Sequence, residues 1–226
     1  MNGVRLVFVV FLYVSASLHI VCGRVFKLGS CPNVEVQENF NLNKFIGQWY
    51  VIQRFQSSSQ CLTQNITVED GDYYLSENGQ LLSSDLLGIN QVSTHEGKLL
   101  VPKKDSPSKM VVDFPLTFIT KSFMTNISDP FGKVNYWVMM TDYDNYAAIW
   151  SCRRMLLGHL QNAEILSRSP TLDKLIINKI RGRFENYGID EHNFSVIDQK
   201  DCRDKKKRNG VGISLFLDNI FGRLRI

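Results

Sequence analysis

The feature that most constrains the fold of this chain is a series of short β-rich runs between residues 47 and 167. Runs rich in branched and aromatic residues and bounded by turn signals predict strands. Many such strands at regular spacing build a sandwich or a closed barrel. Turns are expected at Asp70-Gly71-Asp72 and Asn78-Gly79, and a loop or hairpin tip at 115–133. Examples of the expected strands are 48–55, 62–69, 109–114, 134–141, 146–152 and 163–167.

A single helical pattern follows these runs. Ser169-Pro170 is expected to open the helix and Gly188 to end it, and a short strand at 194–197 should follow. One helix after a set of strands is suited to plug or flank a barrel. The residues at helical spacings of three and four are Leu172, Leu175, Ile176, Lys179, Ile180 and Phe184.

The first residues predict a secretory signal peptide. Arg5 gives the positive start, residues 6–18 are apolar, and Val21-Cys22-Gly23 offers a cleavage site. A membrane anchor is the weaker alternative, because a spanning helix needs roughly 20 apolar residues. The expected parts are therefore a signal peptide at 1–23, one β-rich domain at 24–203 and a basic tail at 204–226.

The cysteines that remain after cleavage form an even set in an exported protein, which predicts two disulfides. Four cysteines allow three pairings, and their positions alone do not choose between them. Cleavage after Ala16 would instead keep Cys22 as an odd thiol. The four are Cys31, Cys61, Cys152 and Cys202. Sequons at Asn65, Asn126 and Asn193 predict glycosylation.

Charge is concentrated in the tail. The chain carries a formal net charge of +4, and residues 204–226 hold six basic and two acidic residues. The β-rich domain therefore lacks the basic surplus of a nucleic-acid-binding protein. The run 205–208 precedes an amphipathic pattern suited to a membrane surface or a partner groove, the alternatives being a disordered end or a processing site. The apolar residues of this pattern are Ile213, Phe216, Leu217, Ile220, Phe221 and Leu224.

Three short motifs carry a family resemblance. Gly47-Gln48-Trp49-Tyr50 lies at the first expected strand, Thr141-Asp142-Tyr143 at a late hairpin, and Arg168 just before the helix. In this order, after a signal peptide, they resemble the lipocalin family, and within it the apolipoprotein D and Lazarillo type. The resemblance implies an all-β fold, an eight-stranded antiparallel up-and-down barrel with one C-terminal α-helix and a short final strand.

The resemblance also assigns structural roles. It implies disulfides Cys31–Cys152 and Cys61–Cys202, and a barrel floor at which the Arg168 guanidinium lies over the Trp49 indole. Such a cation–π contact contributes roughly 1–2 kcal/mol when shielded from water. The implied floor residues are Gly47, Trp49, Thr141, Asp142, Tyr143 and Arg168.

The interior of an eight-stranded barrel holds one small ligand. Two positions depart from the apolipoprotein D type, because Glu164 replaces a large aromatic residue and Ile66 a tyrosine. A carboxylate that faces an apolar cavity is costly unless it is paired or protonated. Glu164 is therefore expected to meet a polar or cationic part of the ligand, or a partner such as Tyr136. The alternative is a shifted strand register that turns Glu164 to solvent. The implied ligand-facing residues, some of which could merely fill core, are Ile66, Tyr136, Val138, Met140, Ala147, Ile149, Asn162, Glu164 and Leu166.

These features favour a non-catalytic secreted carrier or scavenger of a lipid, fatty acid, sterol, retinoid or pigment. One alternative is a membrane-surface signalling or adhesion protein that acts through 205–226. Another is an enzyme that isomerises lipids with a free cysteine in the barrel. His95, His159 and His192 lack metal-ligand spacing, and no catalytic serine or phosphate-loop motif occurs. No metal, cofactor or nucleic acid is therefore expected.

Overall fold

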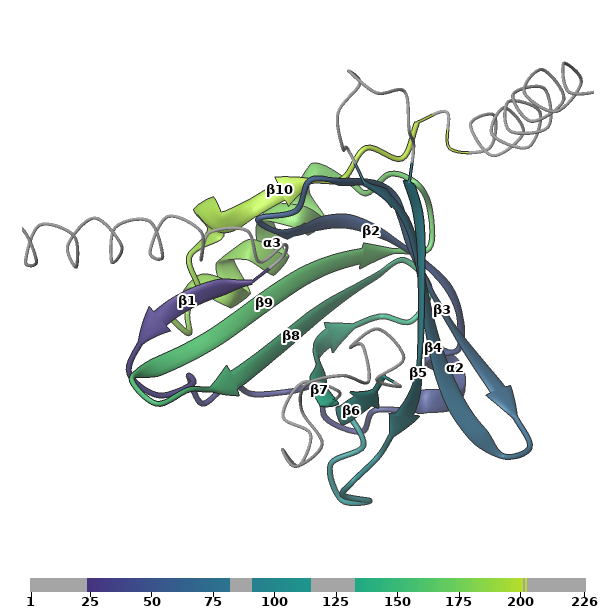
Figure 1. The fold of residues 1–226 in the computed structure, drawn as a ribbon, viewed down its shortest axis with the longest axis horizontal. Coiled ribbons are helices and arrows are strands. Elements are labelled where there is room, and N and C mark those ends of the chain that lie inside the picture. Colours follow the sequence, from purple (N-terminus) through teal and green to yellow (C-terminus); the bar gives the residue numbers. More distant parts are fainter. Residues whose placement is uncertain (1–23, 82–90, 115–132, 201, 203–226) are drawn as a thin grey trace, which may run out of the picture.

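The computed structural model describes residues 24–81, 91–114, 133–200 and 202 (Figure 1). The expected signal peptide, nearly all of the 115–133 segment with its Asn126 sequon, and the basic tail lie outside the described residues. Within the described part, no helix is long and apolar enough to cross a membrane.

Eight antiparallel strands form a closed barrel, in which each strand pairs with the next in sequence and β9 pairs back with β2. β1 (Val25–Leu28) adds to the outside of β9, and β10 (Phe194–Val196) pairs with β2. The eight-stranded up-and-down fold that the resemblance implied is confirmed. The barrel strands are β2 (Gly47–Phe55), β3 (Ser59–Glu69), β4 (Asp72–Leu81), β5 (Gln91–Leu100), β6 (Lys109–Asp113), β7 (Lys133–Thr141), β8 (Tyr146–Arg154) and β9 (Gly158–Ser167).

The helices cover two parts of this barrel. The short helix α2 (Leu42–Phe45) lies at the end of the barrel where β2 begins, and α3 (Lys174–Glu185) lies against the outer wall (Figure 1). One apolar core fills the barrel, and a second lies between its wall and α3. The expected helix start at Ser169-Pro170 is wrong, because Asp173 caps the first turn by accepting a hydrogen bond from the Leu175 N–H. Leu175 itself is 78% exposed and does not belong to the core face.

Two of the register irregularities in the barrel change which way the side chains near the site point. In β2 the pairing with β9 shifts between Val51 and Gln53, and in β7 the pairing with β8 shifts between Val138 and Met140. An extra residue in a strand reverses the alternation of faces beyond it. Arg54 is therefore turned into the barrel, and Met140 is turned out of it.

The expected turn at Asn78-Gly79 is also wrong. Both residues lie inside β4, where Gly79 pairs with Ser93 of β5 and Asn78 with Thr63 of β3. A Cβ on Gly79 would lie 2.6 Å from Leu62 Cδ1, so this glycine allows close packing inside the barrel.

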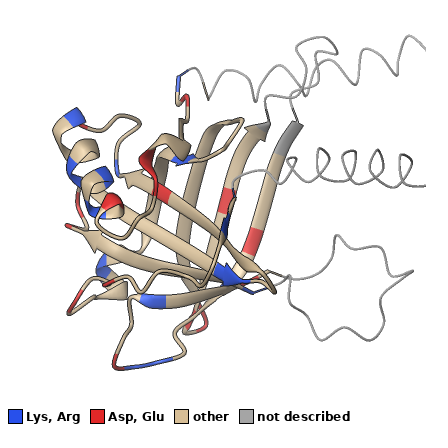
Figure 2. Ribbon diagram, turned by 90° about the vertical axis from the view of Figure 1, so that its left-hand side faces the viewer, with Lys and Arg blue, Asp and Glu red and all other residues tan. Residues whose placement is uncertain are grey.

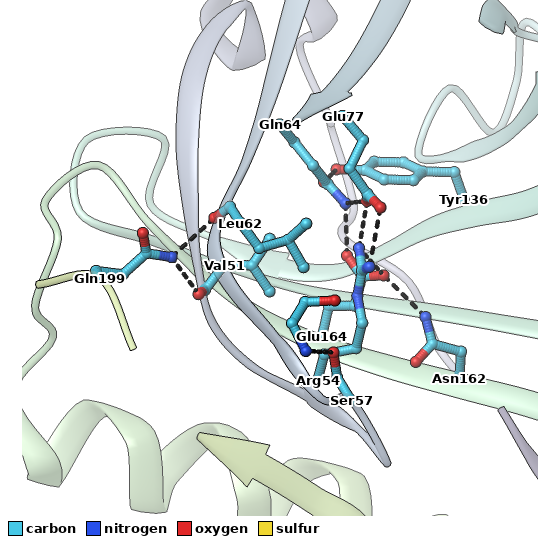
Figure 3. A network of polar contacts seen from close by, with 11 residues as sticks. Val51, Arg54, Ser57, Leu62, Gln64, Glu77, Tyr136, Asn162, Glu164 and Gln199 are labelled. Atoms are coloured by element: carbon cyan, nitrogen blue, oxygen red, sulfur yellow. Dashed lines mark hydrogen bonds and ion pairs between the residues drawn. The ribbon is translucent and has the colours of Figure 1, made fainter. Parts of the chain in front are cut away.

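Two disulfides tie the ends of the described chain to the barrel. Cys31–Cys152 joins the N-terminal segment to β8, and Cys61–Cys202 joins β3 to the segment after β10, the pairing that the resemblance implied. Nearby, Gln199 Nε2 donates to the carbonyls of Val51 and Leu62, both at 2.8 Å (Figure 3). The last described segment is therefore held against β2 and β3 by covalent and hydrogen bonds.

Candidate functional site

The floor of the barrel is built around Trp49 and Arg168. The Arg168 guanidinium carbon lies 3.7 Å from the centroid of the buried Trp49 ring. The N–H groups of Arg168 donate to four backbone carbonyls. The Trp49 indole N–H donates to the Phe45 carbonyl at 3.0 Å. Burial lowers the pKa of Arg168, but the group stays a cation at physiological pH. The four acceptors are the carbonyls of Lys44, Ile46, Gln48 and Tyr143.

The Thr141-Asp142-Tyr143 turn completes the floor. Asp142 accepts hydrogen bonds from the backbone N–H groups of Asn145 and Tyr146, and these bonds hold its pKa below the usual range although burial opposes them. The Thr141 hydroxyl donates to the Tyr146 carbonyl at 2.7 Å. All these contacts lie within the turn or at the floor, which supports structural roles for these residues.

Gly47 allows Arg168 to approach the floor. Its φ is +97°, a conformation that favours glycine, and an added Cβ would lie 3.4 Å from Arg168 Nη1.

Above the floor the barrel is filled by apolar side chains. Four of the predicted ligand residues, Ile66, Val138, Ala147 and Leu166, are fully buried in this inner core. They lie in the core between the floor and the cavity and do not line the cavity.

A cavity of about 530 Å³ occupies the barrel beyond this core. Tyr136, Ile149, Asn162 and Glu164, all predicted ligand residues, line it. Sequence reasoning missed most of its wall, and one part of the reason is that no facing residues were assigned on β4 and β5. The other lining residues are Arg24, Arg54, Gln64, Leu75, Glu77, Thr94, His95, Glu96, Val112, Phe114, Val134, Asn135 and Ser151.

Polar side chains form one side of the cavity (Figure 3). Arg54 Nη1 donates to Glu77 Oε1 at 2.9 Å, and Nη2 contacts both Glu77 Oε2 and, at 2.9 Å, Glu164 Oε1. Gln64 Nε2 donates to Glu77 Oε2 at 3.0 Å and to Glu164 Oε2 at 2.7 Å. Such a group is unusual here, since charged residues are sparse along the barrel strands (Figure 2). The Arg54 cluster consists of Arg54, Gln64, Glu77, Tyr136, Asn162 and Glu164.

The strand register brings this cluster together. Arg54 of β2 is paired with Glu164 of β9, and Gln64 of β3 with Glu77 of β4. Tyr136 reaches the group from β7, where its hydroxyl donates to Gln64 Oε1 at 2.9 Å. Five barrel strands therefore contribute to one buried polar network.

The two carboxyl groups of the cluster differ in proton affinity. Burial raises the pKa of Glu164, and although Arg54 opposes this shift, the neighbouring Glu77 adds to it. Burial acts in the same direction on Glu77, but the charge of Arg54 and its two hydrogen bonds outweigh it and lower the pKa. Burial also raises the pKa of Tyr136, and the Glu164 charge adds to this shift, so the phenol stays a donor.

The cluster retains unused hydrogen-bonding capacity. Arg54 Nε and Asn162 Oδ1 are buried, and neither has a partner among the described residues. One guanidinium faces two carboxylates, so the ionised cluster has one surplus negative charge. A ligand group that donates a hydrogen bond or carries a positive charge would match this surplus, and a free carboxylate would not.

Two sequence expectations about this region require correction. Met140 does not face the interior, because the β7 bulge turns it towards the outer core beside Met139. Glu164 does face the cavity, but its charge partner is Arg54; Tyr136 bonds to Gln64 instead.

The remaining expected sites lie elsewhere. Asn65 is half-buried on the outer face of β3, and Asn193 Nδ2 donates to the Asp190 carbonyl at 3.1 Å. All four cysteines in the described part are in disulfides, so none of them provides a thiol inside the barrel. Within the same residues, no three His, Cys, Asp or Glu side chains are grouped to hold a metal.

Comparisons with known proteins agree with this architecture. Residues 40–199 match a family model described as a lipocalin-like domain. Apolipoprotein D of Cavia porcellus is 33% identical over 188 residues, which cover 80% of this chain and 89% of that protein. Lazarillo protein of Schistocerca americana is 22% identical over 201 residues, 86% and 87% of the two chains.

A solved structure supports the fold independently. Insecticyanin of the tobacco hornworm Manduca sexta superposes with a TM-score of 0.60 at 23% identity, covering 79% of this chain and 91% of the other. At this identity the likeness bears on the fold alone. The closed barrel, the Trp49–Arg168 floor and the family match together show that the chain belongs to the lipocalin family, whose members bind small hydrophobic molecules inside the barrel.

Proposed function

We propose that the protein is a secreted, non-catalytic carrier of a small apolar molecule that bears a neutral or cationic hydrogen-bonding group. The observation that carries this proposal is the Arg54 cluster, a buried polar site with a surplus carboxylate on the wall of the barrel cavity. The ligand's apolar body would contact the cavity wall, and its polar end would lie against the cluster.

The cavity wall supports binding of an apolar body. Leu75 of β4, Val112 of β6, Phe114 just after β6 and Ile149 of β8 line it. Removing roughly 350 Å² of apolar ligand surface from water contributes about 9 kcal/mol before the costs of association. Micromolar or tighter binding is therefore within reach without any charge pairing.

The cluster supports discrimination by head group. A hydroxyl could use Asn162 Oδ1 as acceptor, and an ammonium could do the same while reducing the surplus negative charge. A fatty-acid carboxylate would add a further negative charge to a buried cluster that already has a surplus of one, which costs free energy unless a proton accompanies it. The expected order of affinity at neutral pH is amine or alcohol above carboxylate.

A matched series of ligands tests the proposal. Dodecylamine, dodecanol and dodecanoate share one alkyl chain, and each is titrated at neutral pH by displacement of the fluorescent apolar probe 1-aminoanthracene. We expect the amine and the alcohol to bind at least about tenfold more tightly than dodecanoate, equivalent to about 1.4 kcal/mol. Failure of the probe and of all three ligands to bind would overturn the carrier proposal.

Variants assign the discrimination to the cluster. In Glu164→Gln the surplus charge is removed, so the preference for dodecylamine over dodecanoate should fall. Glu69→Gln, an exposed position at the end of β3, serves as the matched control and should leave the preference unchanged. An unchanged preference in Glu164→Gln would show that the cluster does not contact the head group. Mass spectrometry of small molecules extracted from the natively purified protein would then identify the natural ligand.

A further inference from the structure

An exposed group of apolar side chains lies at the tip of the hairpin between β8 and β9. Met155 is 45%, Leu156 98% and Leu157 77% exposed. On the adjacent strand β1, Phe26 is 52% and Leu28 78% exposed. We call these five residues the apolar rim. Soluble proteins scatter exposed apolar residues singly, so a contiguous group of this kind indicates an interaction surface.

The apolar rim is fixed in place by the fold. Leu28 is paired with Gly158 across the β1–β9 register, and the Met155 N–H donates to the Gly158 carbonyl at 2.8 Å. The Cys31–Cys152 disulfide ties the segment after β1 to β8, three residues before Met155. The exposed side chains are therefore held on a structured, protruding tip.

A basic pocket lies beside the apolar rim. It has a volume of about 260 Å³ and is lined by four cations, one of which, Lys133, also lies 3.7 Å from Asp113 Oδ2. Burial lowers the pKa of Arg24, and the charges of Arg153 and Arg54 add to this shift. The four cations of the basic pocket are Arg24, Lys133, Arg153 and Arg154.

The basic pocket is continuous with the ligand cavity. β8 runs from Tyr146 beside the floor to Arg154 at the opposite end, so both the pocket and the rim lie at the end of the barrel away from Trp49. The residues that line both the pocket and the cavity are Arg24, Val134, Asn135, Ser151 and Asn162.

We propose that the apolar rim and the basic pocket together form a docking surface for an anionic phospholipid bilayer. Apolar side chains flanked by Lys and Arg suit the membrane interface, where the former enter the acyl boundary and the latter meet anionic head groups. The rim is a protruding tip, which fits insertion into lipid better than the groove of a protein partner. Docking at this end would place the ligand cavity at the bilayer, where an apolar ligand could be exchanged.

Vesicle co-sedimentation of the full secreted chain tests this proposal. Vesicles of phosphatidylcholine alone are compared with vesicles containing about 30 mol% phosphatidylserine, which gives a negative surface. We expect binding to the anionic vesicles only, weakened by added salt as screening reduces the attraction. Equal binding to both kinds of vesicle, or to neither, would overturn the proposal.

Charge variants locate the cations responsible. Lys133→Gln/Arg154→Gln removes two exposed cations that do not line the ligand cavity. Each cation near an anionic surface raises the binding constant about fivefold, so the double variant should bind about 25-fold more weakly. Lys103→Gln/Lys104→Gln, in the exposed connection between β5 and β6 at the floor end, is the matched control and should bind normally.

Apolar variants test insertion of the tip. Leu156→Ser/Leu157→Ser should weaken vesicle binding at least about tenfold through loss of buried apolar area, whereas Leu175→Ser, similarly exposed on α3, should not. Binding of 1-aminoanthracene should be unchanged in every variant, which separates failure of docking from failure of the carrier function.

The basic tail supplies the competing outcome. In the full chain, Lys205, Lys206, Lys207 and Arg208 can all be replaced by Gln. If this change abolishes vesicle binding while the rim and pocket variants bind normally, the docking surface proposed at the barrel end is wrong.

Discussion

At the scale of single residues, Arg54 determines whether two buried carboxylates can stay ionised. It contacts Glu77 through both Nη atoms and Glu164 at 2.9 Å, and its side chain is 12% exposed. Removing one partner of a buried ion pair leaves an uncompensated charge, at a cost of about 3–5 kcal/mol. Arg54→Met leaves two such charges in one site. We therefore expect its free energy of unfolding to fall by at least this amount near neutral pH, as measured by urea denaturation.

The dependence of this loss on pH identifies its cause. Without Arg54 the pKa values of both carboxyl groups should be raised, so acidification neutralises them and recovers part of the lost stability. Arg183→Met, which removes an exposed partner of Glu35, is the control and should cost about 1 kcal/mol or less at any pH. A loss in Arg54→Met that is equally large near pH 5 and near pH 8 would point to packing rather than charge.

Glu164 gives a second prediction at this scale. Its pKa is raised in the folded protein, so the folded state binds its proton more tightly than the unfolded state does. The stability from this group is complete below the ordinary carboxyl pKa and is lost as the pH rises through the folded value. Gln does not titrate, so the stability of Glu164→Gln relative to the unaltered protein should rise as the pH increases above the ordinary carboxyl pKa. Parallel stability curves for the two proteins would contradict the raised pKa.

The sequence predicted some residues of the site, and strand bulges explain why it misplaced two others. Trp49 and Arg168 belong to motifs, so their places did not depend on strand register. Arg54 could not be found by alternation from Trp49, because the β2 bulge lies between them and reverses the faces. The β7 bulge misplaced Met140 in the same way. The unusual carboxylate at Glu164 led to the expectation of a polar or cationic ligand group, or of a partner such as Tyr136, and its pairing with Arg54 was not predicted.

At the scale of elements, β1 depends on one glycine of β9. A Cβ on Gly158 would lie 2.2 Å from the Lys27 carbonyl oxygen, so the β1 backbone would have to move. Gly158→Ala should reduce the free energy of unfolding by about 1–3 kcal/mol and should increase hydrogen exchange at the β1 amides. Gly182→Ala on α3 meets no atom within 4 Å and should instead stabilise the helix by up to about 1 kcal/mol. Unaltered hydrogen exchange at the β1 amides of Gly158→Ala would show that β1 does not need its backbone to approach residue 158 so closely.

Helices and strands were predicted best where a single sequence signal, the periodicity of apolar residues, determined them. The β-rich runs and the single late helix were predicted correctly in kind and order, because burial of one face imposes a clear periodicity. Asn78-Gly79 was misassigned because the pair is a strong local turn signal, yet β4 pairs along its length with both neighbours. Tertiary pairing overrode the local preference there. The packing of Gly79 against Leu62 cannot be seen in sequence.

At the scale of the whole molecule, the barrel wall lies between two apolar cores, one inside the barrel and one between the wall and α3. The inner core supports the cavity, and the outer core holds α3 and the N-terminal segment. The architecture was predictable because three motifs fix the floor and the resemblance supplies the closure of β9 on β2. The wall of the cavity was not predictable, because its mixture of polar and apolar side chains comes from most of the barrel strands, which are far apart in the sequence.

The disulfides provide the test at this scale. Cys61–Cys202 and Cys31–Cys152 span 141 and 121 residues, so loop entropy predicts a similar contribution of about 5 kcal/mol from each. Cys61→Ser/Cys202→Ser and Cys31→Ser/Cys152→Ser should therefore lose similar free energies of unfolding. Their local effects should differ, since only the second variant frees the segment beside β1 and the apolar rim. Hydrogen exchange should rise at β1 in that variant and at the segment after β10 in the other, while both keep 1-aminoanthracene binding. Loss of probe binding in the Cys61→Ser/Cys202→Ser variant would mean that the segment after β10 helps to shape the cavity, in addition to packing against β2 and β3.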